Sequence, residues 1–124
     1  MDKPLILIVA GDPSGDLHGS RLARELRAGG ARVAAVGGPL LRREADEFLE
    51  DLASHAITGF WEPAVKAGFL FKLALRLRRW LLARRPAAVV CVDYYGFNRR
   101  VLGLAKAAGV PAYYFISPQV WASR

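Results

Sequence analysis

Short blocks of consecutive apolar residues, each closed by turn residues, recur along this chain. The blocks predict four strands: Leu5–Ala10, Arg32–Val36, Ala88–Val92 and Ala112–Ile116. Between them, apolar residues return every three or four positions, which predicts four helices: Gly15–Ala28, Leu40–Phe48, Ala67–Arg84 and Asn98–Ala108. Continuously apolar strands that alternate with helices are typical of a parallel sheet buried on both faces. The pattern therefore predicts an α/β fold with helices on both faces of the sheet.

Three predicted loops follow the carboxyl ends of predicted strands. They read "GDPSGD" from Gly11, "DYYGFN" from Asp93 and "SPQVW" from Ser117. Ligands of open α/β sheets bind beyond the carboxyl ends of the strands. We therefore expect the functional site to be assembled from these loops.

Length and charge narrow the possible functions. The chain has 124 residues and a formal net charge of +7, so it predicts one domain that favours an anionic partner. The one cysteine, Cys91, lies in the apolar block "AAVVCV" and is expected to be a core residue, which is typical of a cytoplasmic protein. The apolar run Leu5–Ala10 is too short for a signal peptide, and no uncharged run is long enough to span a bilayer.

The first loop matches neither common nucleotide motif. Asp16 stands where a Walker A sequence needs its second glycine, and Pro13 occupies the second glycine position of the dinucleotide pattern. Ser14, Gly15 and Asp16 remain at a helix start, where backbone N–H groups can bind an anion and carboxylates can bind sugar hydroxyls. Alternatively, Ser14 or Asp16 only caps the helix. The residue types alone leave both interpretations open.

Further polar residues lie beside the predicted strand ends. Asp93 directly follows an apolar strand, where a general base is expected, although a turn or cap is the alternative. Asn98 begins the following helix, and His18 lies one turn into the first helix. The segment "HAITGFWEP" forms a loop that carries Gly59 and Glu62.

A strongly basic and apolar segment spans residues 66–86. It contains seven cationic and no acidic residues, and Lys72, Arg76 and Arg79 share one helical stripe. With Phe69, Phe71 and Trp80, this stripe is suited to an anionic membrane surface or to acyl chains. The alternative is a core helix with a solvated basic edge. Nucleic acid is disfavoured, because the aromatic residues alternate with aliphatic ones.

Five motifs, in order, resemble the landmarks of the lipid-A-disaccharide synthase family. They are "AGDPSGDLHG" at Ala10, "VGGP" at Val36, "AITGFWEP" at Ala56, "VDYYGFN" at Val92 and "YFISPQVWA" at Tyr114. The resemblance implies that residues 1–124 form the Rossmann-like, acceptor-side first lobe of a two-lobed GT-B glycosyltransferase. It implies inverting transfer of 2,3-diacylglucosamine from UDP to 2,3-diacylglucosamine 1-phosphate, without metal or cofactor, at the cytoplasmic side of the inner membrane.

The resemblance also assigns roles to individual residues. Asp93 corresponds to the catalytic aspartate. The positions expected to bind substrate are Ser14, Gly15, Asp16, His18, Gly59, Glu62, Asn98, Ser117 and Gln119. The positions expected to contact the membrane or acyl chains are Phe69, Phe71, Lys72, Arg76, Arg79 and Trp80.

The chain departs from the family pattern at three points. Gly96 replaces a second aspartate, and Asp12-Pro13 replaces Glu-Ala. The donor-binding lobe that follows in the family is missing, so we expect a fragment or half of a split enzyme that is inactive alone and needs the second lobe or a partner chain. The alternative is a non-catalytic lipid- or nucleotide-binding Rossmann module, which has no need of Asp93.

Overall fold

A computed structural model describes residues 3–54, 62–93 and 95–115 of the chain. Its strands are β1 (Leu5–Ala10), β2 (Arg32–Gly37), β3 (Glu47–Asp51), β4 (Ala88–Val92) and β5 (Ala112–Phe115). They form a parallel sheet in the order β3-β2-β1-β4-β5. Strands β2 and β3 are added on one side of β1, and β4 and β5 on its other side. The strand order therefore reverses between β1 and β4, and such folds bind ligands in the crevice at this position.

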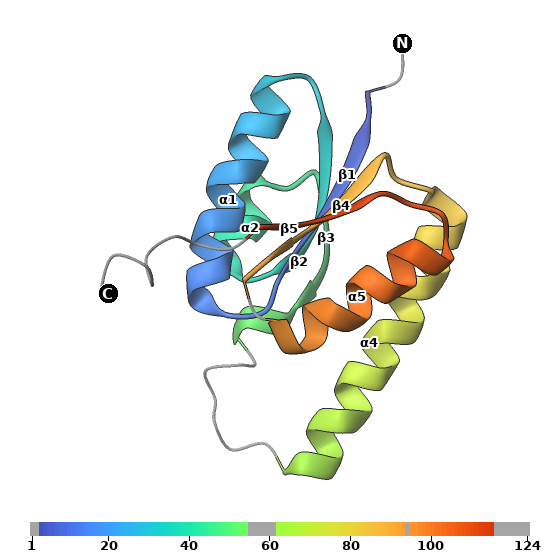
Figure 1. Cartoon of the computed structure of the whole chain (residues 1–124). Coiled ribbons are helices and arrows are strands. Elements are labelled where there is room, and N and C mark those ends of the chain that lie inside the picture. The colour runs from blue at the N-terminus through green and yellow to red at the C-terminus, as the bar shows by residue number, and fades with distance from the viewer. Residues whose placement is uncertain (1–2, 55–61, 94, 116–124) are drawn as a thin grey trace, which may run out of the picture.

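Helices cover both faces of this sheet, which confirms the predicted fold. They are α1 (Pro13–Ala28), α2 (Pro39–Glu44), α4 (Pro63–Arg84) and α5 (Tyr95–Ala107). Figure 1 shows α1 and α2 on one face, with α4 and α5 on the other. Each face has its own buried cluster, one around Ile8 and Leu41 and the other around Leu7, Leu77 and Val101. No described helix meets the length and hydropathy needed to cross a membrane.

The predicted helix Leu40–Phe48 is wrong in its second half. Helix α2 ends at Glu44, and residues Glu47–Asp51 pair with β2 as the edge strand β3. Asp46 fixes the change of direction, because its carboxylate accepts a hydrogen bond from the Val33 N–H at 2.8 Å. The spacing of Leu41, Ala45 and Phe48 imitates a helical period, whereas the charged "EFLED" segment is typical of an edge strand.

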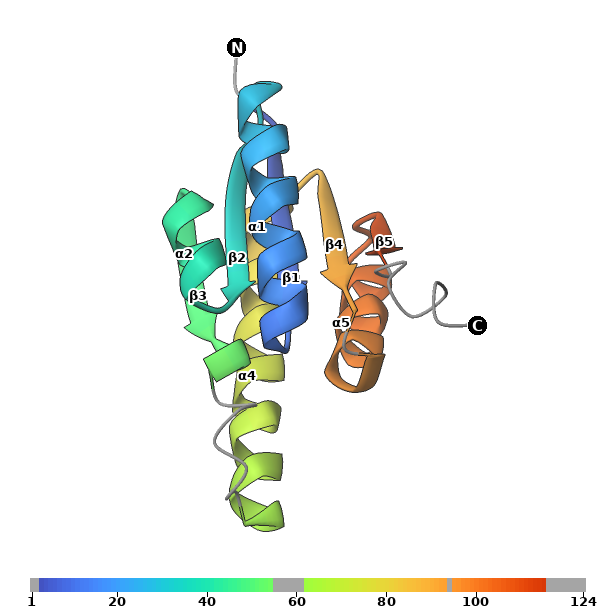
Figure 2. The ribbon, with the colours of Figure 1, turned by 90° about the vertical axis from the view of Figure 1, so that its left-hand side faces the viewer.

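Helix α4 extends beyond the carboxyl ends of the strands. Its buried residues Leu73, Leu77 and Leu81 recur every four positions and pack against the sheet. Residues 62–68 are all exposed, and Figure 2 shows this first part of α4 projecting past the sheet. The helix therefore carries exposed side chains to the end of the molecule where the strands terminate.

Candidate functional site

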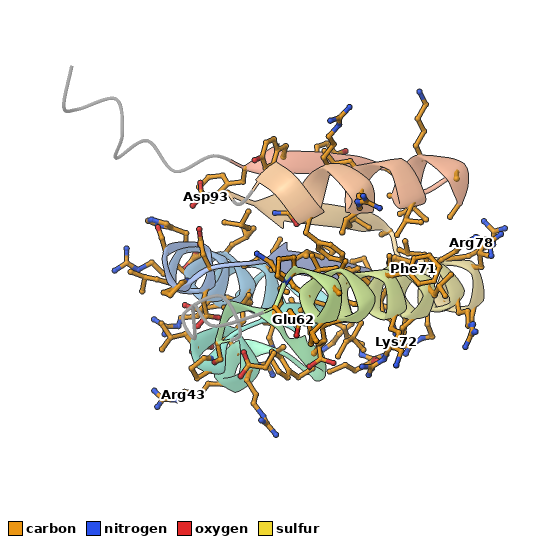
Figure 3. All side chains as sticks on the ribbon, turned by 90° about the horizontal axis from the view of Figure 1, so that it is seen from below. Arg43, Glu62, Phe71, Lys72, Arg78 and Asp93 are labelled. Atoms are coloured by element: carbon orange, nitrogen blue, oxygen red, sulfur yellow. The ribbon has the colours of Figure 1, made fainter. Side chains whose placement is uncertain are left out.

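Asp93 lies at the carboxyl end of β4, between β5 and α5. Its N–H donates a hydrogen bond to the Phe115 carbonyl at 2.8 Å, and its own carbonyl accepts one from Asn98 Nδ2 at 2.9 Å. The backbone of Asp93 is thus held on both sides by neighbouring elements. Figure 3 looks onto this edge and shows Asp93 where α5 begins.

The backbone of Asp93 has a left-handed conformation with φ of 48°. Few residues other than glycine adopt this region, although aspartate and asparagine tolerate it best. Such conformations persist where the surrounding structure enforces them, and they are frequent at functional sites. Asp93 as a whole residue is half-buried, and its Oδ2 atom is buried. A carboxylate held in this way is suited to accept a proton from a bound hydroxyl.

Asn98 is completely buried, with 0% of its surface exposed, and its expected contact with substrate stays a prediction. Its Nδ2 donates to the carbonyls of Asp93 and Val92, at 2.9 and 3.2 Å, and approaches that of Val9 at 3.5 Å. These carbonyls end β4 and β1. Asn98 therefore fixes the strand ends around Asp93 and acts as a positioning residue.

Asp12 caps helix α1. Its Oδ1 accepts a hydrogen bond from the Gly15 N–H at 2.7 Å, so this N–H is not available to an anion as the sequence suggested. Close packing also explains the glycine at position 15, because a Cβ atom there would lie 3.2 Å from the Val92 carbonyl and 3.1 Å from Asp12 Oδ1. The absence of a side chain lets α1 begin directly against β4. Gly15 therefore positions the helix, and its expected contact with substrate stays a prediction.

Asp16 caps a different helix, α2. Its carboxylate accepts hydrogen bonds from the N–H groups of Gly38 at 2.8 Å, Leu40 at 3.0 Å and Leu41 at 2.9 Å. Only 3% of the residue is exposed. A buried carboxylate with three backbone donors is a structural anchor. The expected contact of Asp16 with substrate stays a prediction. A Cβ atom on Gly38 would lie 2.6 Å from Asp16 Oδ2, which explains the glycine.

A cavity of about 210 Å³ lies beside this anchor. Its lining residues are Pro13, Asp16, Pro39, Leu40, Ala53 and Ser54. They come from the starts of α1 and α2 and from the segment after β3, and most are apolar. Asp16 joins the starts of α1 and α2 and therefore shapes this cavity at the carboxyl edge of the sheet.

The remaining predicted substrate-binding positions fall into two groups. Ser14 and His18 are half-buried on α1, and Glu62 is exposed at the start of α4. Figure 3 shows Glu62 apart from Asp93, so these two carboxylates do not form a pair. The other positions lie outside the described residues: Gly59, Ser117 and Gln119.

Helix α4 divides the predicted membrane-contact residues into two sets. Lys72 and Arg79 are exposed, and Phe71 is 61% exposed. By contrast, Phe69 and Trp80 are half-buried against the core, because they lie nearer the Leu77 side of the helix. Their predicted contact with the membrane or acyl chains stays a prediction. Figure 3 shows Phe71 and Lys72 on opposite sides of α4.

Several cations near β3 are held by acidic residues. Arg76 lies 3.5 Å from Glu50, and Arg84 donates to both Glu47 oxygens at 2.7 Å. The Arg84 hydrogen bond lowers the pKa of Glu47, and the Arg84 guanidinium also lies 5.5 Å from the Trp80 ring centroid. Arg76 is therefore the member of the predicted basic stripe whose charge is already paired.

Neither a reactive cysteine nor a metal-binding cluster is present in the described parts of the chain. Burial raises the pKa of the Cys91 thiol to about 12, so it is protonated at neutral pH. Within residues 3–54, 62–93 and 95–115, no three His, Cys, Asp or Glu side chains gather to hold a metal ion.

Sequence reasoning missed the turn between β2 and α2. This turn supplies the three N–H groups that occupy Asp16, and its position directly after a strand in "VGGP" was the available signal. It also missed Arg100, which lines a groove between α4 and α5. No local pattern distinguished Arg100 from the adjacent Arg99.

Known structures share this fold at low sequence identity. The glycotransferase of kitacinnamycin is 20% identical, with a TM-score of 0.64 over 94% of this chain and 31% of that chain. The C-terminal domain of a hydrogenase from Pyrococcus furiosus is 16% identical, with a TM-score of 0.69 over 93% of both chains. Proteins with different names thus share the architecture, so these likenesses establish the fold alone.

Sequence comparison is more specific. The lipid-A-disaccharide synthase of Syntrophus aciditrophicus (strain SB) is 38% identical over 126 residues, covering 100% of this chain and 33% of the relative. That of Geobacter metallireducens is 38% identical over 121 residues, covering 96% of this chain and 32% of the relative. The chain thus spans about a third of the length of these curated relatives. The profile described as lipid-A-disaccharide synthetase matches residues 6–124, and the chain therefore belongs to this family.

Proposed function

We propose that this chain supplies the acceptor-side lobe of an inverting glycosyltransferase of lipid A biosynthesis. The reaction transfers 2,3-diacylglucosamine from UDP-2,3-diacylglucosamine to 2,3-diacylglucosamine 1-phosphate and releases UDP. The observation that carries the proposal is Asp93, whose backbone is held at the carboxyl end of β4 within a family match that spans residues 6–124. The family membership supports the substrate class.

In the proposed mechanism, Asp93 acts as the general base. Its carboxylate takes the proton from the acceptor 6-hydroxyl while that oxygen attacks the anomeric carbon of the donor. The bond from this carbon to the UDP oxygen breaks as the new glycosidic bond forms, and UDP leaves with the bonding electron pair. Asn98 holds the backbone of Asp93 in place through its hydrogen bond to the Asp93 carbonyl.

The donor requires a second lobe. We assign the UDP-binding site to a further segment of the same protein or to a partner chain, and residues 1–124 to the acceptor. This division agrees with the coverage of the relatives, of which the chain spans about a third. No step of the proposed reaction uses a metal or an organic cofactor.

The complete enzyme, with its donor lobe, provides the test. Acceptor-dependent release of UDP is measured for the wild type and for Asp93→Asn. Loss of the general base should lower kcat by roughly 10²- to 10⁴-fold, with little change in the KM for the acceptor. Wild-type turnover in Asp93→Asn would rule out the general base. Binding of lipid or nucleotide without any UDP release would favour the non-catalytic module.

We also propose that the protein works as a peripheral protein on the cytoplasmic face of the inner membrane. An acylated acceptor does not leave the bilayer freely, because each CH₂ brought into water costs about 0.8 kcal/mol. Helix α4 carries the exposed apolar residues Phe71 and Leu75, at 61% and 38%, on one side and the exposed cations Lys72 and Arg79 on another. This mixture is suited to an anionic lipid surface.

Vesicle co-sedimentation tests the membrane proposal. The double variant Lys72→Glu, Arg79→Glu should bind anionic vesicles at least about tenfold more weakly than the wild type at low salt, and the difference should shrink at high salt. The matched control is Arg21→Glu, Lys106→Glu, which makes the same charge change on α1 and α5. Equal losses in both variants would indicate net charge alone and would exclude a specific role for α4.

A further inference from the structure

Helices α4 and α5 enclose an open groove on their shared face of the sheet. Its volume is about 360 Å³, and its lining residues are Ala67, Leu70, Phe71 and Arg100. Three of these four residues are apolar, and Phe71 is 61% exposed. Figure 3 shows Phe71 on the side of α4 that faces α5. An apolar chain in this groove would remove exposed apolar surface from water, which favours its binding.

Arg100 places one cation in this apolar groove. Its side chain is exposed, and among the described residues it has no ion-pair partner. Other arginines that contact acidic residues, such as Arg76 and Arg84, lie on the opposite, β3 side of α4. A guanidinium beside an apolar wall complements a ligand that joins a phosphate to a hydrocarbon chain.

The groove also lies close to the reacting carboxylate along the chain. Helix α5 begins at Tyr95, two residues after Asp93, and Arg100 follows five residues later. At about 1.5 Å per residue, this places Arg100 roughly 7.5 Å along the helix from its start. Asp93 and Arg100 are therefore connected by the first turns of one helix.

From these observations, we propose that the α4–α5 groove is the subsite for the phosphorylated, acylated end of the acceptor. An acyl chain lies against Leu70 and Phe71, and the phosphate is bound by Arg100. This subsite rests on the proposed function for the identity of the sugar. It assigns the acyl chain and the phosphate to residues that the family resemblance did not single out, with the exception of Phe71.

Decyl phosphate, used below its micelle concentration, is the probe. Its binding to the chain is followed through the backbone amide NMR shifts of residues 67–71 and 100. We expect Arg100→Gln to weaken binding about tenfold or more, because the charged partner of the phosphate is lost. The matched control Arg99→Gln removes an exposed cation one position away and should change the affinity by less than about twofold. Inorganic phosphate should bind far more weakly than decyl phosphate, because it lacks the chain.

Three results would overturn the proposal. They are equal losses in Arg99→Gln and Arg100→Gln, no shift at residues 67–71, or equal affinities for inorganic phosphate and decyl phosphate. Phosphatidylglycerol vesicles distinguish substrate from bulk lipid: both variants should lower vesicle binding equally, and a vesicle-only loss in Arg100→Gln would assign the groove to the bilayer. This readout does not depend on turnover, so it separates failure of the subsite from failure of Asp93 as the base.

Discussion

The loops after β1 and β4 lie at the same edge of the sheet and both carry aspartates, but they use them differently. In the loop after β1, Asp12 caps its own helix and Asp16 accepts three backbone hydrogen bonds from the start of α2. In the loop after β4, Phe115 and Asn98 hold the backbone of Asp93 by hydrogen bonds, and the residue is half-buried. The difference identifies the first loop as an anchor and agrees with our proposal that the second loop carries the general base.

This difference explains why the loop after β1, which binds phosphate in many α/β proteins, contains two aspartates in this chain. A phosphate needs free N–H groups, and here the Gly15 N–H and the N–H groups at the start of α2 already have carboxylate partners. The carboxylates thus stand in the place of the anion. The sequence left open that Ser14 or Asp16 caps α1, but the structure gives this cap to Asp12, and Asp16 instead binds the start of α2.

The largest expected effect on stability comes from Asp16. Replacing Asp16 with Ala leaves three N–H groups without acceptors and should lower the free energy of unfolding by roughly 3–5 kcal/mol. Urea denaturation followed by circular dichroism measures this change. Asp12→Ala is the matched control, because it removes one cap hydrogen bond from the same loop and should cost only about 1 kcal/mol. Equal losses would contradict the assignment of Asp16 as the main anchor.

The smallest expected effect comes from the exposed ion pair on β3. The Arg84 hydrogen bond lowers the folded pKa of Glu47. The pair therefore stabilises the fold above the unfolded pKa of Glu47, about 4.3, and this contribution disappears as pH falls through the lower folded pKa. Glu47→Gln should cost less than about 1 kcal/mol at pH 7 and nothing in strong acid. Glu25→Gln, on exposed α1 surface, is the control; a loss that persists in strong acid would exclude the ionic origin.

The sequence predicted most of the fold because its strands are continuous apolar blocks. Strand β3 was not predicted, because it is an edge strand in which three of the five residues are acidic. Its few apolar positions also continue the spacing of α2. The hydrogen-bond partners of the site residues could not be predicted, for a different reason. Asp16 and Asp93 both follow strands in polar loops, and what distinguishes them is a set of partners 22 to 25 positions from Asp16. Such tertiary hydrogen bonds leave no local pattern in the sequence.

The most direct test of the account measures turnover and stability together in Asp93→Asn and Asp16→Asn of the complete enzyme. We predict that Asp93→Asn lowers kcat by roughly 10²- to 10⁴-fold and changes the free energy of unfolding by less than about 1 kcal/mol, since asparagine tolerates the left-handed backbone. Asp16→Asn should lower stability by about 1–3 kcal/mol, since its amide cannot accept the Leu40 N–H, while the folded fraction keeps kcat within about tenfold of the wild type. The reverse result, with kcat lost in Asp16→Asn and kept in Asp93→Asn, would contradict the assignment of the two loops.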